Sequence, residues 1–288
     1  MTQALIGIIG GSGLYRMEAL QNARQLDLVT PYGAPSSPLT LGDVNGTPVA
    51  FLARHGSSHS LLPGEVPYRA NIHAMKQLGV RYLLSFSAVG SLKEEIAPLD
   101  MVIPDQYIDM TRQRPNTFFG EGAVAHVSLA QPVCAALCDL LAQAVKQLPE
   151  DRSVNLHKNG TYLCMEGPQF STLAESNFYR SLDASVIGMT NMPEARLARE
   201  AQIAYASLAM VTDYDCWHPR EAQVTAELAI RNLMENAEKA QLIAQNAITL
   251  IAKASPRSAA HDALKQGLVT PLADLTSERR ALVELLLS

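Results

Sequence analysis

Two aspartates two positions apart are the residues of this chain best suited to acid–base chemistry. Asp213 and Asp215 follow the apolar run 204–211, which predicts a buried strand. Side chains on a strand alternate between its faces, so we expect both carboxylates on one face and Tyr214 on the other. Repulsion between close carboxylates raises the pKa of one, which then donates a proton near neutral pH. The pair therefore suits a leaving group or a nucleobase edge, with a simple turn or helix cap as the alternative.

Polar and small residues also follow several other apolar runs. Ser12 lies in the glycine-rich turn 10–13, and Arg54 and His55 follow the run 49–53. Backbone amides, hydroxyls and guanidinium groups bind anions. Further amides, hydroxyls and a ring able to stack on a flat heterocycle come from Ser87, Ala88, Phe170, Met189 and Thr190. Together these residues predict a site for a phosphate and a nitrogen heterocycle, although each alone is also ordinary turn or core chemistry.

Alternation of strand and helix patterns predicts the fold that positions these residues. Strands are expected over 5–10, 49–54, 81–87, 101–104, 160–165, 184–189 and 204–213, and helices over 68–78, 131–148, 172–181, 194–201 and 221–252. This order predicts one α/β domain, residues 1–253, with a central mixed, largely parallel sheet flanked by helices. Ligands of such sheets gather at the carboxyl ends of the strands. Residues 254–288, with helical spacing over 275–287, are expected to pack on the domain or on a neighbouring subunit.

The composition argues against several classes of partner. The 23 basic and 28 acidic residues give a formal net charge of −5, which offers no electrostatic footprint for nucleic acid. The apolar run 4–9 has no basic flank and ends at Gly10, so neither a signal peptide nor a membrane span is expected. Four cysteines without a CxxC or Cys/His cluster predict neither disulfides nor a metal site. A reducing cytoplasm is the simplest location.

The glycine-rich turn also permits an NAD-dependent dehydrogenase as a competing hypothesis. The dinucleotide motif GxGxxG would require glycine at position 16, where the chain has Arg16, and no clear acidic partner follows about 20 residues later. A phosphate-binding P-loop is not expected either, because no GK[ST] sequence follows the turn. A third hypothesis is a non-catalytic nucleoside-binding protein, which the same set of residues would also serve.

Six stretches resemble, in order, the family of trimeric purine nucleoside phosphorylases and methylthioadenosine phosphorylases. They are residues 6–14, 52–56, 88–92, 166–170, 188–194 and 212–217. The resemblance implies catalytic roles for His55, Asp213 and Asp215, with the two aspartates at the purine N7 and exocyclic amino group. It places Met189 at the ribose and Phe170 at the purine ring, and it counts Tyr214 among the substrate-binding residues. It further implies that phosphate is bound by Ser12, Arg54, His55, Ser87, the Ala88 backbone and Thr190.

The reaction implied by the resemblance is reversible phosphorolysis of methylthioadenosine, with phosphate as co-substrate and no metal or other cofactor. Asp213 is favoured as the acid, although the sequence does not separate it from Asp215. Relatives that act on 6-oxopurines carry Glu and Asn at the positions of Ser171 and Asp213. A carboxylate accepts from a 6-amino group and repels a 6-oxo group, so the alternative, a 6-oxopurine or methylthioinosine phosphorylase, is disfavoured.

Two further expectations come from the same resemblance. Ala226 stands where 6-oxopurine enzymes place a histidine for the 5′-hydroxyl, so an apolar 5′ pocket is expected that suits a methylthio group and leaves room for adenosine. Relatives of this kind are homotrimers, and His126 matches the residue that reaches from one subunit into the 5′ pocket of its neighbour.

Overall fold

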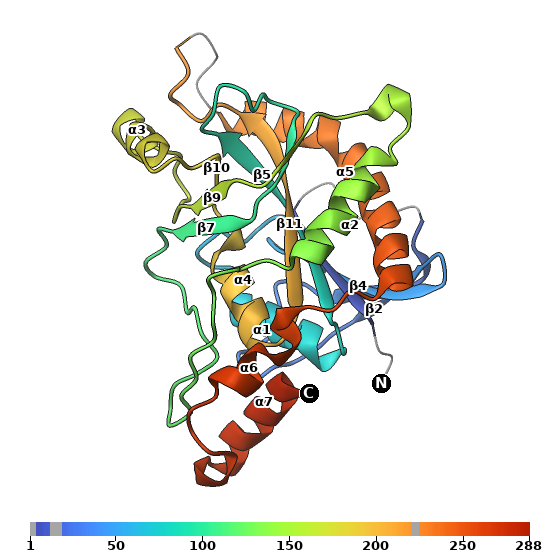
Figure 1. Cartoon of the computed structure of the whole chain (residues 1–288), viewed down its shortest axis with the longest axis vertical. Helices are drawn as coiled ribbons and strands as arrows, with labels where there is room; N and C mark the ends of the chain where they lie inside the picture. Colours follow the sequence, from blue (N-terminus) through green and yellow to red (C-terminus); the bar gives the residue numbers. More distant parts are fainter. Residues whose placement is uncertain (1–3, 12–18, 220–224) are drawn as a thin grey trace.

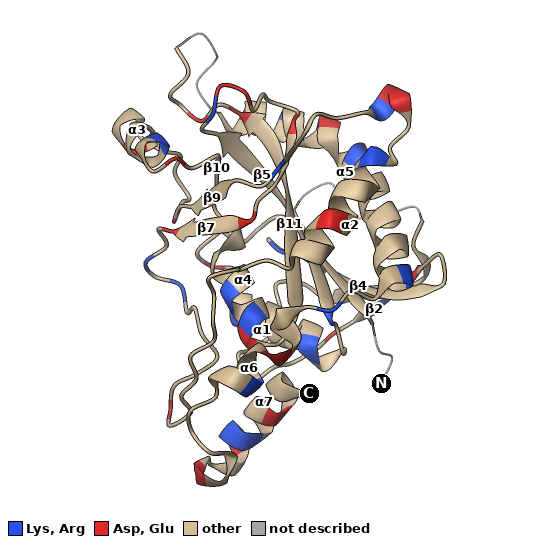
Figure 2. Cartoon of the chain, in the orientation of Figure 1, with Lys and Arg blue, Asp and Glu red and all other residues tan. Residues whose placement is uncertain are grey.

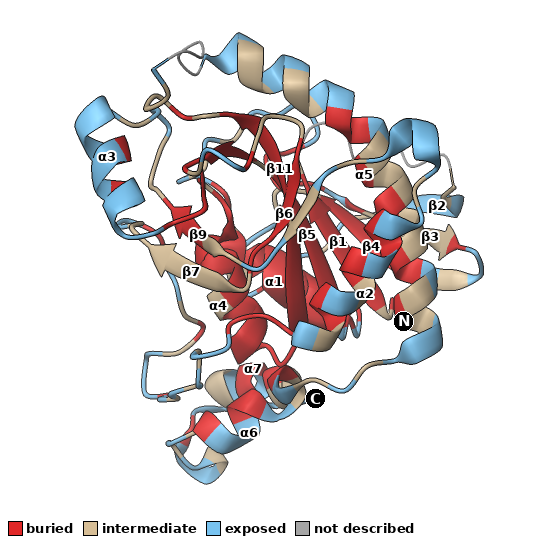
Figure 3. Ribbon diagram, turned by 45° about the horizontal axis from the view of Figure 1, so that its top comes forward, coloured by how far each residue is buried: buried red, intermediate tan, exposed pale blue. Residues whose placement is uncertain are grey.

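The computed structural model describes residues 4–11, 19–219 and 225–288, and within them eleven strands form one sheet (Figure 1). Strand β1 pairs in parallel with β4 and β5, and β5 pairs in parallel with β11. Figure 3 shows these central strands largely buried, as expected of a sheet covered on both faces. The central strands are Ile6–Gly10 (β1), Thr47–Ala53 (β4), Tyr82–Ser91 (β5) and Ala204–Asp213 (β11).

Shorter strands extend this centre and make the sheet mixed. They are Gln21–Leu26 (β2), Leu39–Val44 (β3), Met101–Ile103 (β6), Gln106–Asp109 (β7), Leu156–Lys158 (β8), Thr161–Cys164 (β9) and Val186–Gly188 (β10). The β2–β3, β3–β4, β5–β10 and β6–β11 pairs are antiparallel. The β6–β8, β7–β9 and β9–β10 pairs are parallel. The expected mixed, largely parallel α/β sheet is therefore confirmed.

Helices cover both faces of the sheet. Helices α2 and α5 pack together on one face, and α1 and α4 pack on the other (Figures 1 and 3). The helices are Tyr68–Gln77 (α1), Ala135–Lys146 (α2), Leu173–Ser181 (α3), Asn191–Glu200 (α4), Ala226–Ala254 (α5), Ala263–Gly267 (α6) and Ser277–Leu287 (α7), with 3-10 turns at Glu150–Arg152, Ala259–Asp262 and Leu272–Asp274.

Each strand and helix predicted from the sequence is present to within a few residues, and 204–213 matches β11 residue for residue. Residues 221–224, where the last long helix was expected to begin, lie outside the described part. The sequence patterns missed β2, β3, β7 and β8. Strand β2 (QNARQL) is polar and almost wholly exposed, so it lacks the alternation that marks a half-buried strand.

Side-chain caps fix the first turns of two helices near the site. The Thr172 hydroxyl accepts from Glu175 N at 3.2 Å, and the Glu175 carboxylate accepts from Thr172 N at 2.8 Å, which forms a capping box at α3. At α5, the Thr225 hydroxyl accepts from Leu228 N at 3.1 Å. The start of α5, which forms one wall of the cavity described below, is thereby held in place.

Residues 255–288 dock on the domain through backbone and side-chain hydrogen bonds. Lys76 Nζ donates to Ser288 O at 2.7 Å, and Gln202 Nε2 donates to Leu287 O at 3.0 Å. Val269 N donates to Val124 O at 2.9 Å. The extension therefore contacts α1, the end of α4 and the loop that follows Phe118.

Charged residues of both signs are interspersed over the described helices and loops (Figure 2). Helix α7 illustrates this pattern, with Glu278, Arg279 and Arg280 in its first turn and Glu284 in its second. In the part of the chain that the structure describes, no helix combines the length and apolar character that a membrane crossing requires.

Candidate active site

A cavity of about 580 Å³ opens at the carboxyl ends of the central strands. Its wall also includes the loop after β4, residues 55–63, and the first turns of α5. This is the edge at which ligands of such sheets bind. Of the residues predicted from the sequence, the cavity wall brings together Arg54, His55, Ser87, Ala88, Phe170, Met189, Thr190, Asp213, Asp215 and Ala226.

Three predicted residues do not line this cavity, and a fourth falls in a part of the chain that the structure does not describe. Ser12 lies outside the described residues. Tyr214 points away, because its hydroxyl donates to Glu94 O at 3.2 Å and its ring stacks on His218 with 4.6 Å between centroids; its position gives no support to a role in substrate binding. Ser171 lies beside Asp215, with its hydroxyl 3.9 Å from Met165 Sδ. His126 is exposed on a loop away from the cavity wall of its own chain.

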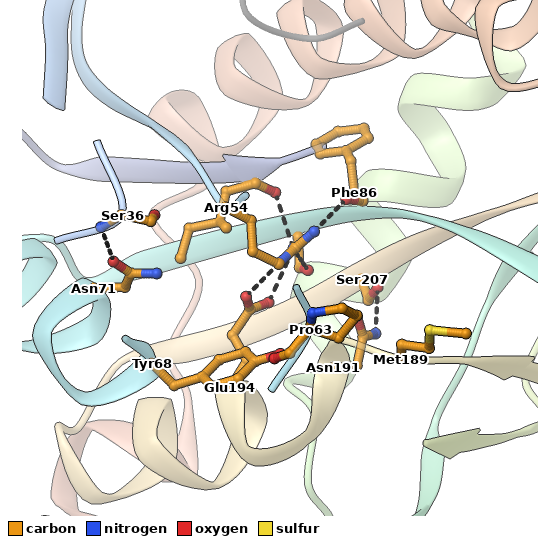
Figure 4. A network of polar contacts seen from close by, with 12 residues as sticks. Ser36, Arg54, Pro63, Tyr68, Asn71, Phe86, Met189, Asn191, Glu194 and Ser207 are labelled. Atoms are coloured by element: carbon orange, nitrogen blue, oxygen red, sulfur yellow. Dashed lines mark hydrogen bonds and ion pairs between the residues drawn. The ribbon is translucent and has the colours of Figure 1, made fainter. Parts of the chain in front are cut away.

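Arg54 provides a fixed positive charge at the cavity floor (Figure 4). Its side chain is 1% exposed. Nε donates to Glu194 Oε2 at 2.9 Å, Nη1 donates to Phe86 O at 3.0 Å, and Nη2 donates to Ser85 Oγ at 2.7 Å. Burial would lower the pKa of the guanidinium, but the Glu194 carboxylate raises it above its usual range, so Arg54 stays charged. Most of its five donors are used within the protein, so it attracts an anion mainly through its charge.

Glu194 holds Arg54 in place, a contact that the sequence reasoning missed. It lies on α4, 140 positions from Arg54, and its Oε1 also accepts from Tyr205 Oη at 2.8 Å. The carboxylate lies within one of the stretches that carry the family resemblance, but nothing in the local pattern identifies Arg54 as its partner. The pair positions the guanidinium between the ends of β4 and β5.

His55 is neutral at physiological pH and presents one lone pair. Its Nδ1 lies 2.9 Å from Leu61 O, and because a carbonyl only accepts, Nδ1 carries the proton and Nε2 is left as an acceptor. Burial, followed by the charge of Arg54, lowers the pKa of His55 to about 4. The His59 ring stacks on it with 4.6 Å between centroids. His55 is therefore suited to accept from a protonated phosphate oxygen.

Ser87 and Thr190 supply hydroxyls without protein partners. Both side chains are buried in the cavity wall, and neither Ser87 Oγ nor Thr190 Oγ1 has a partner at hydrogen-bonding geometry. Leaving a buried polar atom unsatisfied costs about 1–3 kcal/mol, so two such hydroxyls in a cavity wall suit a ligand that forms hydrogen bonds with them. The backbone of Ala88 lies beside them in the same wall.

Asp213 is buried and held by two donors. Its Oδ1 accepts from Asp215 N at 2.8 Å and its Oδ2 accepts from Thr212 Oγ1 at 2.7 Å. Gly90 leaves room for the carboxyl, because a Cβ at that position would lie 2.9 Å from Oδ1. Burial raises the pKa of Asp213 to about 6, and the charge of Asp215 adds less. The sequence therefore predicted the raised pKa correctly, but attributed it to repulsion where burial is the larger cause.

Asp215 reaches the same cavity by a different route from the one predicted. Strand β11 ends at Asp213, and Asp215 has a φ of 53°, in the left-handed region. The turn, and not strand alternation, thus brings the second carboxyl to the cavity. Burial also raises the pKa of Asp215, while the Ser176 and Ser171 hydroxyls oppose this effect. Among the described residues, no group of three His, Cys, Asp or Glu side chains is placed to hold a metal ion.

The remaining flank of the cavity is apolar. Phe170 is 42% exposed at its mouth, and Met189 lies deeper in the wall. The first turns of α5 contribute Ala226, Ala229, Ile230, Leu233 and Met234. The cavity therefore has an anion-binding floor, a carboxyl pair and an apolar flank, which together fit a phosphate, a nitrogenous base and an apolar substituent.

Arg114, a second residue that sequence reasoning missed, ties the segments of the cavity together. Its Nη1 lies 3.0 Å from Tyr68 Oη, 2.6 Å from Met189 O and 2.8 Å from Met192 O. Its Nη2 donates to Glu166 O at 2.6 Å and its Nε to Glu166 Oε1 at 2.9 Å. Arg114 thereby fixes Met189 and the turn that leads to Phe170. In the sequence it is one arginine in a long loop, with no pattern that signals these partners.

The sequence profile described as the phosphorylase superfamily matches residues 5–250. Because this match spans the whole sheet and the cavity wall, the chain belongs to the phosphorylase superfamily.

Individual relatives within this superfamily are similar to the chain over most of its length. The S-methyl-5′-thioadenosine phosphorylase of Thermosynechococcus vestitus is 56% identical over 287 residues, which cover 99% of this chain and 98% of that protein. That of Synechocystis sp. is 58% identical over 271 residues, which cover 94% and 83%. A solved methylthioadenosine phosphorylase from an Antarctic soil metagenomic library has a TM-score of 0.94 at 57% identity, with 100% of both chains covered. The Schistosoma mansoni enzyme in complex with adenine has a TM-score of 0.81 at 34% identity, covering 87% and 93%.

Proposed function

We propose that this chain is an enzyme that catalyses the reversible phosphorolysis of S-methyl-5′-thioadenosine to adenine and 5-methylthioribose 1-phosphate, with inorganic phosphate as co-substrate. One observation carries the proposal: a single cavity joins an anion-binding floor, a buried carboxyl whose pKa is about 6, and an apolar flank. Each feature matches one part of the substrates. The Thermosynechococcus and Synechocystis relatives, more than half identical over most of the chain, support the same reaction.

Phosphate binds at the floor. The charge of Arg54 attracts it, while Ser87 Oγ and Thr190 Oγ1 donate to its oxygens together with the backbone at Ala88 and the Ser12 hydroxyl. The lone pair of His55 Nε2 accepts from a phosphate oxygen that carries a proton. Phosphate held there lies below the sugar, ready to attack C1′.

The carboxyl pair acts on the base. As a phosphate oxygen bonds to C1′, the C1′–N9 bond breaks and its electron pair passes to the purine, through a transition state with positive charge on the sugar. Asp213 donates its proton to N7, so adenine leaves as a neutral molecule. Asp215 accepts from the 6-amino group. The Asp213 carboxylate then takes a proton from solvent, which completes the cycle.

The same site sets substrate preference. The Asp215 carboxylate accepts from a 6-amino group and repels a 6-oxo group, and Ser171 places no further carboxylate beside Asp215. The methylthio group lies against the apolar first turns of α5. Since Ala226 and Ala229 are small, adenosine also fits, and we propose that it is cleaved as a second substrate.

We also propose a homotrimer in the cytoplasm. Phe178 and Leu173 on α3, and Ile230 and Met234 beside the cavity, are between 52% and 59% exposed, as expected of surfaces that a second copy covers. His126 is exposed away from its own cavity, consistent with a role in the neighbour's. The four cysteines are free thiols, which suits a reducing compartment.

Phosphate-dependent release of free base from methylthioadenosine, adenosine, methylthioinosine and inosine tests the proposal. We expect the two 6-amino substrates to be cleaved, and an Asp213→Asn variant to lose them or to shift toward the 6-oxopurines. An Asp27→Asn variant, at an exposed position, is the matched control and should behave like the wild type. Preference of the wild type for inosine would show that the carboxyl pair does not select a 6-amino group. Binding of methylthioadenosine without cleavage would support a non-catalytic nucleoside-binding protein.

A further inference from the structure

Tyr162 lies directly beneath the anion-binding floor, although it is not part of the cavity wall. The side chain, on β9, is fully buried. It reaches under the neighbouring strand β10, where a Cβ at Gly188 would lie 2.0 Å from the Tyr162 hydroxyl oxygen. Any residue larger than glycine there would displace this hydroxyl. The close approach brings the phenol to Thr190, two residues further along the chain, and to Ser87 at the end of β5.

Three buried hydroxyls thus meet at one place without satisfied hydrogen bonds. Tyr162 Oη, Ser87 Oγ and Thr190 Oγ1 are all buried, and none has a partner at hydrogen-bonding geometry. The three hydroxyls are nevertheless close neighbours. Burial raises the pKa of the Tyr162 phenol, and the hydroxyls of Thr190 and Ser87 and the Thr190 N–H lie near enough to offset part of that rise. Three adjacent unsatisfied hydroxyls point to an arrangement that is completed only when a ligand binds.

The number of protons that the three hydroxyls can donate indicates the role of the phenol when an anion binds. Each hydroxyl has one proton and two lone pairs. To bind an unprotonated phosphate oxygen, Ser87 and Thr190 must both turn their protons into the cavity. Their oxygens then present only lone pairs toward Tyr162, which has one proton to donate. The Thr190 N–H also lies close to the phenol oxygen and suits one of its lone pairs.

We propose that Tyr162 is a positioning residue for phosphate: its hydroxyl donates to Ser87 or Thr190 and thereby aims their protons at the anion. This inference rests on the proposed phosphorolysis. The chain of hydrogen bonds from Tyr162 through a hydroxyl to phosphate is cooperative, because each donor polarises the next. Tyr162 does not touch substrate, so its effect is confined to the affinity for phosphate.

A purely structural role makes the opposite prediction for phosphate affinity. Tyr162 packs in the core, with its ring 5.7 Å from that of Tyr107. If only this packing mattered, phenylalanine would serve as well and would remove an unsatisfied buried hydroxyl. The Tyr162→Phe variant would then bind phosphate normally and be as stable as the wild type or more so.

Phosphate affinity of Tyr162→Phe therefore tests the inference. Titration calorimetry with inorganic phosphate alone gives Kd without turnover, and steady-state rates give the two KM values. We expect the Kd and KM for phosphate to rise about three- to tenfold, with the KM for methylthioadenosine unchanged and the thermal midpoint not lowered. Tyr82→Phe, which removes a buried hydroxyl bonded to Pro256 O at 3.0 Å, is the matched control and should leave phosphate affinity unchanged.

Two outcomes would overturn the inference: a phosphate Kd in Tyr162→Phe within about twofold of the wild type, or an equal rise in Tyr82→Phe. A wild type that binds phosphate but cleaves nothing would instead refute the proposed function and leave the Kd comparison intact. Because the phenol acts through Ser87 and Thr190, its effect should vanish in a Ser87→Ala, Thr190→Val background. Persistence of the full effect there would refute the role, even if the single variant were destabilised.

Discussion

Ionisation of the buried Asp213 should destabilise the folded protein. Its carboxyl has a folded pKa of about 6 against an ordinary value of 3.8, an upward displacement of about two pH units, which corresponds to about 3 kcal/mol. Because the folded pKa is raised, the stabilising contribution is fully present below about pH 3.8 and is lost as the pH rises through about 6. The Asp213→Asn variant keeps the shape and cannot ionise.

The difference in unfolding free energy between the variant and the wild type should therefore grow with pH. We expect it to move by about 2.5 kcal/mol in favour of Asp213→Asn between about pH 4 and about pH 8. The new amide must face Thr212, whose hydroxyl is also 3.2 Å from Val89 O and can turn to donate there. Any cost of this rearrangement is independent of pH and cancels from the comparison.

Urea unfolding at several pH values and one fixed protomer concentration measures this difference. Asp27→Asn, at an exposed position, is the control and should change little with pH relative to the wild type. A difference for Asp213→Asn that stays flat across this range would refute the account, because it would mean that Asp213 has an ordinary pKa and is a poor acid for N7.

Three further substitutions test other parts of the site. Glu194→Gln leaves the buried Arg54 without its carboxylate, so we expect a loss of about 3–5 kcal/mol in unfolding free energy and a raised KM for phosphate; a variant as stable as the wild type would refute the pairing. Arg114→Lys cannot reproduce the fork that holds Met189 O and Glu166, so the KM for the nucleoside should rise roughly tenfold while that for phosphate stays constant; a rise in both would contradict this division. Ala226→His introduces a polar group at the apolar flank, so the ratio of kcat/KM for adenosine to that for methylthioadenosine should increase, and a decrease would place the 5′ group elsewhere.

Much of the fold could be predicted because its central strands carry their own signal. Strand β11 is a continuous apolar run that ends at Asp213. The burial of the strand and the place of Asp213 at the carboxyl edge of the sheet therefore both follow from the sequence. The polar strand β2 has no such pattern. It is held by pairing with β3, whose residues are distant in sequence, so the local sequence pattern does not indicate a strand.

The site was predictable where side chains follow strands and unpredictable where it depends on tertiary contacts. Ser87, Thr190 and Asp213 each sit at a strand end. Arg54 was expected to bind phosphate, but the sequence did not show that Glu194, on a helix distant in sequence, holds its guanidinium. Arg114 and the apolar turns of α5 reach the cavity only because the chain folds back on itself, which periodicity cannot reveal.

Identification of the sugar product tests the central claim most directly. The wild type would be incubated with methylthioadenosine, with and without inorganic phosphate, and both products would be identified by mass spectrometry. The account predicts adenine and 5-methylthioribose 1-phosphate in equal amounts, and neither product without phosphate. Release of adenine together with free methylthioribose, independent of phosphate, would contradict it, because water and not phosphate would then be the nucleophile.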